Sequence, residues 1–403
     1  MKLNHIYKSI ACGVLLAMTA TSCDLDYNPV DTYSDVTEGV NKTDEKPIFN
    51  SVQDVETSMV TLHKKFRDRQ EHWYVDKLLI GDAHSDNAYA GTTGAEVVPY
   101  ETNSIEGSNS VLKRDWDRFL GDIAVANRII VGCDQLKALS ESERGKYQSQ
   151  AKIFRAMVMF DMVRLWGNFP VITTVGGDIT EDNVEEMYPT YFPPQNTAEE
   201  AYAQIEKDLT EAVENPNTPT NDTSDKSILT KSVARAMLAK VYAEKPLRDY
   251  AKVINYADEL EAHFPPGSGN WCTWMFGRNL SNWDESFTWA KWITPSRDLI
   301  RLYEEQGDTK RYNESVVWYD CGWSNYYPAD HYAFMYKCRS AFNSIIYLRY
   351  ADILLLKAEA KIMGEAPDLN GAADIIDRIR NRAGLGKLPQ STRSSKEALL
   401  QAY

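Results

Sequence analysis

The chain has 403 residues and a formal net charge of −14, because 58 acidic side chains outnumber 44 basic ones. An acidic chain is a poor match for nucleic acid, whose phosphates require a basic surface, so we expect no nucleic-acid partner. The length would allow two or three domains, but the composition is even along the chain, and a single extended helical unit is equally compatible with it.

The first 22 residues have the pattern of a bacterial lipoprotein signal peptide. Lys2 and Lys8 accompany an apolar segment, residues 10–20, that is too short to remain as a membrane span. Three small residues then precede Cys23, the arrangement that a lipoprotein signal peptidase cleaves. We predict that Cys23 carries acyl chains, palmitate among them, that anchor the protein to a membrane. An ordinary secretory signal with an incidental cysteine is the alternative. Residues 23–46 are polar and lack periodicity, which predicts a flexible tether.

From residue 47 to residue 403 we predict one domain, in which helical patterns dominate. Apolar residues recur with helical spacing in the following segments: 52–73, 110–139, 142–165, 197–214, 230–244, 249–263, 344–363, 370–383 and 395–403. Thr197 and Glu200 have the spacing of a capping box. Segments 81–107 and 171–197 lack this spacing and are predicted to be loop and irregular structure. The fold class is therefore predicted to be mostly α.

Two of the predicted helix pairs repeat each other without a gap. Residues 239–244, AKVYAE, match residues 360–365, AKIMGE, and three further identities follow at the same offset: Pro246 with Pro367, Ala251 with Ala372, and Ile254 with Ile375. Small residues allow paired helices to approach closely, as in tetratricopeptide (TPR) repeats, although the complete TPR signature is absent. Two unrelated helical hairpins that share alanine are the alternative. We predict TPR-like helix-pair repeats.

One long apolar helix ends in a distinctive motif. Residues 154–170 read FRAMVMFDMVRLWGNFP, and Gly167 and Pro170 end the helix. This order of residue types resembles the RA-x-x-x-aromatic-x-x-x-RL-aromatic-G-x-aromatic-P signature of the SusD/RagB family, the surface nutrient-binding lipoproteins of Bacteroidetes. Further family-like segments follow in order: 205–212, IEKDLTEA, 348–360, LRYADILLLKAEA, and 379–384, IRNRAG. Together these matches cover most of residues 150–385.

The resemblance implies a function as well as a fold of TPR-like helix pairs. It implies a lipid-anchored outer-membrane protein that faces the cell surface, binds an oligosaccharide or polysaccharide without catalysis, and passes it to a SusC-like TonB-dependent transporter. A peptide ligand, as in some RagB-like members, and a helical scaffold without a small ligand are the alternatives. Family members usually continue beyond the position of Tyr403, so we expect the C-terminal region to be short by comparison.

The candidate ligand-binding residues gather in a long excursion from the helical pattern, residues 264–343, which contains seven of the ten tryptophans. A flat ring covers the apolar face of a sugar while neighbouring polar groups bond its hydroxyls. The predicted binding residues are Trp283, Trp289, Trp292, Trp318, Trp323, Asn325, Tyr326 and, from an earlier loop, Tyr89. The alternative is that these rings fill a small core of the excursion, for which Trp271, Trp274 and Phe276 are the strongest candidates. Two or three stacked rings would give roughly millimolar to micromolar affinity.

Catalysis and metal binding find little support in the sequence. A glycoside hydrolase needs two carboxylates across a cleft, and nothing distinguishes Asp284, Glu285 or Asp298 from other acids. Motifs for nucleotide, zinc-hydrolase or serine-nucleophile chemistry are absent from the sequence. The acids near residues 82–87 lack the spacing of a calcium-binding loop. We therefore expect no enzyme activity, no cofactor and no metal.

Four cysteines remain besides Cys12 and Cys23, namely Cys133, Cys272, Cys321 and Cys338. We expect free thiols, with a disulfide from Cys272 to Cys321 or Cys338 as the alternative.

Overall fold

The computed structural model describes residues 47–67, 76–85, 87–90, 96–177, 184–220, 225–244, 246–264, 274–279, 294–322, 326–336 and 344–403. The chain divides into two units, Met1–Pro47 and Ile48–Tyr403, and every element described below belongs to the second. The predicted signal peptide, Cys23 and the tether lie outside the described residues, so these stay predictions.

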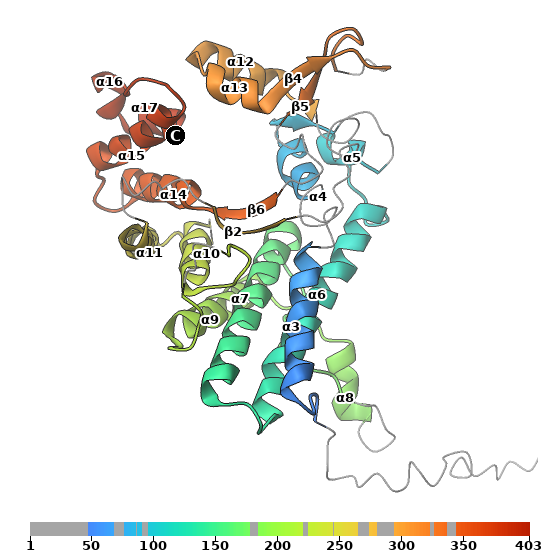
Figure 1. Ribbon diagram of the computed structural model, residues 1–403. Helices are drawn as coiled ribbons and strands as arrows, with labels where there is room; N and C mark the ends of the chain where they lie inside the picture. The colour runs from blue at the N-terminus through green and yellow to red at the C-terminus, as the bar shows by residue number, and fades with distance from the viewer. Residues whose placement is uncertain are drawn as a thin grey trace, which may run out of the picture. The chain divides into compact units, whose positions relative to one another are not determined.

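Long helices form the body of the second unit (Figure 1). They are α3 (Val52–Arg67), α6 (Ser110–Gln135), α7 (Glu141–Trp166), α9 (Ala198–Glu214), α10 (Lys231–Ala243), α11 (Tyr250–His263), α14 (Tyr350–Met363) and α15 (Leu369–Arg382), with the short α16 (Gln390–Arg393) and α17 (Lys396–Ala402) at the end. Each long helix packs against a neighbour, in the order α3, α6, α7, α9, α10, α11, α14 and α15. The predicted mostly helical fold is confirmed, as is the capping box of Thr197 and Glu200 at the start of α9.

The two repeated segments form the helix pairs α10–α11 and α14–α15. Helix α11 packs against α14, so the second pair stacks on the first although residues 264–349 separate them in the chain. Ala239 and Ala372, two of the small residues that predicted close approach, are fully buried. Stacked helix pairs in which each contacts the next are the architecture of helical repeat proteins, and the predicted TPR-like pairing is confirmed.

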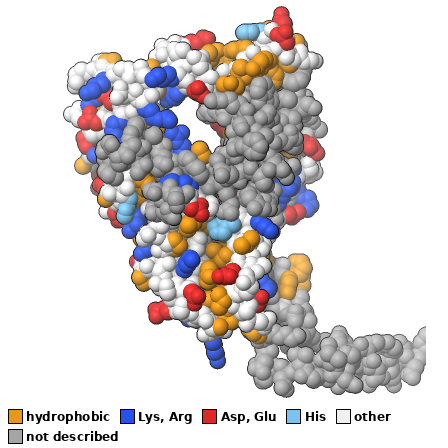
Figure 2. All heavy atoms as spheres, in the orientation of Figure 1, with side chains coloured by type: hydrophobic (Ala, Val, Ile, Leu, Met, Phe, Trp, Pro, Cys, Tyr) orange, Lys and Arg blue, Asp and Glu red, His pale blue; other side chains and the backbone are white. Residues whose placement is uncertain are grey.

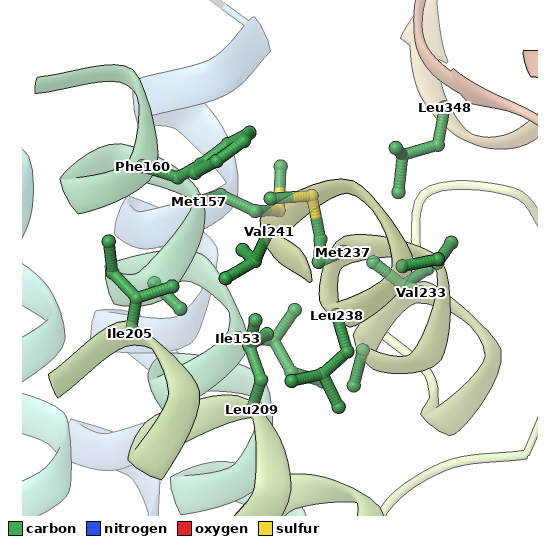
Figure 3. Packing of buried hydrophobic residues seen from close by; sticks show 14 of the residues in the cluster. Ile153, Met157, Phe160, Ile205, Leu209, Val233, Met237, Leu238, Val241 and Leu348 are labelled. Atoms are coloured by element: carbon green, nitrogen blue, oxygen red, sulfur yellow. The ribbon is translucent and has the colours of Figure 1, made fainter. Parts of the chain in front are cut away.

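The main hydrophobic core lies where α7, α9, α10 and strand β6 (Ser344–Arg349) meet. Figure 3 shows Met157 and Phe160 of α7 facing Val241 and Met237 of α10, with Leu348 approaching from β6. These side chains are 0–1% exposed. Fully burying one such side chain contributes about 1.5–3 kcal/mol to folding. Helix α7 is buried even at two charged positions, since Arg155 is 4% and Asp161 is 6% exposed.

Two glycines of α6 give a matched test of this packing. A Cβ atom at Gly132 would lie 2.4 Å from the Phe49 ring, which is buried, whereas a Cβ atom at Gly121 has no heavy atom within 4 Å. We expect Gly132→Ala to destabilise the protein by about 1–3 kcal/mol through overpacking. Gly121→Ala is expected to stabilise it by about 0.5–1 kcal/mol through helix propensity. Urea denaturation measures both, and equal effects of the two changes would contradict the described packing.

Shorter elements occupy most of the segments that were predicted to be irregular. They are α4 (Asp76–Leu78), the π-helical turn η3 (Leu79–Ala83), α5 (Val98–Glu101), α8 (Val184–Tyr191), α12 (Arg297–Gln306) and α13 (Thr309–Ser315). The strands are β1 (Ala88–Tyr89), β2 (Trp274–Asn279), β3 (Thr294–Pro295), β4 (Val316–Tyr319), β5 (Tyr332–Met335) and β6 (Ser344–Arg349). They form three antiparallel pairs, β1–β3, β2–β6 and β4–β5. The predictions of loop over 81–107 and of irregular structure over 171–197 were therefore wrong in part. Residues 344–349, which were predicted to begin a helix, instead form a strand, because they pair with residues 274–279.

Charged side chains attach the segment before β1 to the long helices. The Arg114 guanidinium of α6 donates to both carboxylate oxygens of Asp76 in α4, at 2.8 and 2.6 Å. Next along α4, Lys77 forms an ion pair with Asp161 of α7, and the Tyr347 hydroxyl of β6 donates to the same carboxylate at 3.1 Å. These contacts fix the chain that leads through η3 into β1, which carries Tyr89.

Candidate functional site

The structure describes three of the eight predicted ligand-binding residues, Tyr89, Trp318 and Tyr326. The other five lie outside the described residues, and they are Trp283, Trp289, Trp292, Trp323 and Asn325. Of the predicted core members of the excursion, Trp271 lies outside the described residues, as do the side chains of Trp274 and Phe276. The assignments for these residues stay predictions.

The three described residues belong to one small hydrophobic cluster, which we call the aromatic cluster. Its buried members come from α12, β4, β5 and the loop before β5, and they are Ile300, Val316, Tyr327, Tyr332, Ala333 and Phe334. Tyr89, Trp318 and Tyr326 pack against these members and stay partly exposed. The aromatic cluster is separate from the helical core. The fold therefore brings Tyr89 next to rings from a part of the chain more than 200 residues away.

Tyr89 and Tyr326 form a parallel stack. Their ring centroids are 4.4 Å apart and the planes differ by 8°. Strand β1 places Tyr89 beside β3, so its hydroxyl reaches the first turn of α12 and accepts the backbone N–H of Arg297 at 3.3 Å. The Arg297 guanidinium donates to the carbonyl of Tyr326 and lies 5.1 Å from the centre of the Tyr327 ring. Backbone and side chain of one arginine thus hold both members of the stack.

Glu101 fixes the other end of Tyr326. The Tyr326 hydroxyl donates to Glu101 Oε2 at 2.6 Å, and the backbone N–H of Ala90 donates to the same oxygen at 2.9 Å. Burial, together with this carboxylate, raises the pKa of Tyr326 well above its usual range, so the phenol stays protonated and donates. Sequence reasoning missed Glu101, since it is one acid among 58 and its partner is 225 residues away.

Trp318 is also held in place, with one face covered. The His331 ring stacks on it with centroids 4.1 Å apart and planes within 5°, and the Tyr327 ring meets it edge to face at 5.3 Å. The indole Nε1–H of Trp318 donates to the Tyr312 hydroxyl at 2.9 Å. His331 is exposed, and Tyr319 is 49% exposed. These two rings, which the sequence did not single out, lie more open to solvent than Trp318.

The surface near this cluster combines apolar and aromatic side chains with a few charged ones. Figure 2 shows hydrophobic side chains at the upper end of the molecule, where β4 and β5 lie in Figure 1. Exposed Tyr319 belongs to this region. The exposed polar residue Asp320 follows Tyr319 in sequence, and exposed Asp330 precedes His331. Rigid rings beside hydrogen-bonding groups suit a ligand that has both an apolar face and hydroxyls.

The acids and cysteines considered for hydrolysis, metal binding or a disulfide lie as follows. Asp298, one of the acids weighed for hydrolysis, lies on exposed α12 in an ion pair with Arg301 at 3.2 Å, whereas Asp284 and Glu285 lie outside the described residues. Among the described residues, no three His, Cys, Asp or Glu side chains are arranged to hold a metal ion. Burial raises the pKa of the Cys133 thiol to about 12. Cys272 and Cys338 lie outside the described residues. In the part that the structure describes, no helix combines the length and apolar character needed to cross a bilayer.

Two family models match the sequence. Residues 33–243, more than half of the chain, match the model described as "Starch-binding associating with outer membrane", and residues 335–402 match the model of the SusD family. A SusD-like protein of Bacteroides ovatus is 26% identical over 236 residues, which are 58% of this chain. The match spans 38% of the length of that relative.

Solved structures share the fold. A SusD superfamily protein from Bacteroides vulgatus superposes with a TM-score of 0.69 at 17% identity, over 87% of this chain and 83% of that one. A laminarin-binding SusD-like protein superposes with a TM-score of 0.62 at 19% identity, over 88% of this chain and 89% of that one. At these low sequence identities, the structural similarity establishes the fold alone.

Proposed function

Because this chain belongs to the SusD family, as its motifs predicted, we propose that it captures oligosaccharides or polysaccharides at the outer-membrane surface and passes them to a SusC-like TonB-dependent transporter. The anchor in this proposal is the lipidated Cys23. A family model described by starch binding and outer-membrane association supports the ligand class and the location, and so does the fold shared with a laminarin-binding protein. The role is binding and handover without bond chemistry.

The observation that carries the proposal is the rigidity of the half-exposed rings in the aromatic cluster. Tyr326 is fixed at its hydroxyl by Glu101 and at its carbonyl by Arg297, and Trp318 is fixed at its indole nitrogen. A ring that is already ordered loses little conformational entropy when a sugar stacks on it. If a sugar covers roughly 60–100 Å² of one ring, that contact contributes about 1.5–2.5 kcal/mol.

The proposed ligand binding is tested with the chain lacking residues 1–22. Its binding to starch, laminarin and a panel of peptides is measured. We expect one neutral glucan to retard the protein in affinity electrophoresis, and Trp318→Ala to weaken the affinity about tenfold or more, because a stacking surface is lost. Tyr326→Phe is expected to weaken it less, since the ring remains and only its anchor to Glu101 is removed. Leu302→Ala, at a side chain 45% exposed on α12, is the control.

Circular dichroism separates loss of binding from loss of fold in these variants. If a folded Trp318→Ala variant binds the glycan with unchanged affinity, the aromatic cluster is not the binding site. If no glucan retards the protein and a peptide binds it, the ligand class would be peptides and not glycans.

A further inference from the structure

Helix α8 carries an unusual concentration of exposed apolar side chains. Within the described residues, four of the ten exposed large hydrophobic side chains lie between positions 184 and 192, and they are Val184, Tyr188, Tyr191 and Phe192. Tyr188 is 55% and Phe192 is 65% exposed. None of the four belongs to the aromatic cluster. In Figure 1 α8 lies at the lower end of the view, whereas β4 and β5 lie at the upper end.

Contacts hold these rings in place although they face solvent. The rings of Tyr188 and Phe192, one helical turn apart, stack with centroids 4.7 Å apart and an angle of 30°. The Tyr191 hydroxyl donates to the carbonyl of Gly177 at 2.6 Å. Gly176 lies against the same ring, since a Cβ atom there would be 3.1 Å from Tyr191 Cζ. The three rings are thus ordered before any ligand arrives, which lowers the entropy cost of binding.

Charge along this part of the chain narrows the class of ligand. Residues 184–192 contain two Glu and no Lys, Arg or His. Such a segment repels phosphate and sulfate groups, which disfavours a phospholipid surface and an acidic polysaccharide. The exposed side chains are mainly aromatic, and exposed Glu185 adds a carboxylate that accepts hydrogen bonds from hydroxyls. Rings with acceptors fit a neutral sugar, which has apolar C–H faces and hydroxyl rims.

We propose that Val184, Glu185, Tyr188, Tyr191 and Phe192 form a second binding site, for a neutral polysaccharide, in addition to the aromatic cluster. The inference rests on the proposed function for its ligand class and adds a separate site. Two sites on one chain bind one long polymer together, so the second contact forms at a high effective concentration. A short oligosaccharide contacts one site at a time and gains no such advantage.

The test compares four forms of the chain without residues 1–22: the unaltered protein, Trp318→Ala, the double variant Tyr188→Ala/Phe192→Ala, and the combination of all three changes. Affinity electrophoresis against starch and laminarin measures retention by the polymers, and calorimetry measures binding of their short oligosaccharides. Val60→Ala, at a side chain 53% exposed on α3, is the matched surface control.

The double variant is expected to stay folded and to weaken retention by the polymer about tenfold or more. Val60→Ala is expected to leave retention unchanged. The combined variant is expected to lose the retention that remains in Trp318→Ala. If the double variant matches the unaltered protein while Trp318→Ala abolishes retention, the second site is overturned and the proposed function stands. If the unaltered protein is retained by neither polymer, the proposed function itself fails. A change of molar mass in light scattering caused by the double variant would identify the surface as a contact between copies and would also overturn the proposal.

Discussion

Replacement of Asp208 by asparagine is expected to lower the free energy of unfolding by about 3–5 kcal/mol, one of the largest effects of any single polar substitution in this chain. Asp208 is 1% exposed in α9, and its carboxylate accepts two hydrogen bonds from Arg155 of α7, at 2.7 Å from Nε and 2.6 Å from Nη2. The asparagine variant leaves the guanidinium of Arg155 buried and uncompensated.

The pair is the centre of a larger network that joins four segments. Arg155 also donates to Asn127 of α6 at 2.7 Å, and the Asn127 amide donates to the carbonyls of Ile172 and Thr174 at 2.9 and 3.2 Å. Loss of one charge therefore disturbs α6, α7, α9 and the segment after α7 together. Both Arg155 and Asp208 lie in the motifs that carry the family resemblance, so those motifs include a structural ion pair.

Urea denaturation followed by circular dichroism measures the effect. Asp117→Asn is the control, because Asp117 forms an exposed ion pair with Lys113 and is expected to change stability by less than about 0.5 kcal/mol. The double variant Arg155→Met/Asp208→Leu is expected to be more stable than Asp208→Asn, since apolar side chains remove the buried charge. A loss of less than about 1 kcal/mol in Asp208→Asn would contradict the buried pair.

The second large effect is a loss of stability as the pH rises from about 4 to about 8. Asp76 and Asp115 are 0% and 1% exposed and are hydrogen-bonded to each other. Burial, followed by the neighbouring charge of Asp115, raises the pKa of Asp76 to about 8, against the lowering effect of Arg114. Burial raises the pKa of Asp115 to about 6, with Arg114, Arg118 and Lys77 acting in the opposite direction. The two carboxyls titrate as a coupled pair.

Both folded-state pKa values lie above that of an aspartate in an unfolded chain, about 3.9. The folded protein therefore holds more protons than the unfolded chain between about pH 4 and pH 8, and its stability is fully present at the lower end of this window. The free energy of unfolding falls as the pH rises, by up to about 1.4 kcal/mol per pH unit for each proton concerned.

Asp115→Asn isolates the contribution of this pair. The amide removes the neighbouring charge, so Asp76 is expected to ionise nearer its usual range beside Arg114, and the decline of stability with pH is expected to flatten. Urea midpoints measured from pH 5 to pH 9 give both slopes, and Asp117→Asn on the same helix should retain the slope of the unaltered protein. Equal slopes in the Asp115→Asn variant and the unaltered protein would show that the pair does not carry the effect.

Local signals in the sequence were sufficient for most of the helices. The capping residue Thr197, the termination at Gly167 and the ungapped match between α10–α11 and α14–α15 depend on residues close in the chain. Short elements were missed because distant contacts stabilise them. Helix α5, for example, lies in a segment rich in Gly and Thr, and its Glu101 is bonded by Ala90 and Tyr326.

The site was predicted by kind of residue and not by arrangement. Trp318 and Tyr326 were named because they lie in an aromatic-rich stretch, and Tyr89 because it ends a polar loop. The fold gathers all three in one cluster, whereas their role in ligand binding stays a prediction. The stack of His331 on Trp318 and the rings of α8 had no periodic or motif signal to reveal them. The bond between Arg155 and Asp208 was not predicted, because the two residues are 53 positions apart in the chain.

The separation of the aromatic cluster from the helical core has an evolutionary consequence. Ile300, Val316 and Phe334 pack with one another and not within the core that α7, α9 and α10 share. Substitutions at well-separated positions affect stability independently, so residues around these rings can change while the stacked helices keep their full stability. Under the proposed function, a lineage can therefore acquire new ligand preferences by altering the cluster alone, without first accumulating stabilising changes elsewhere in the fold.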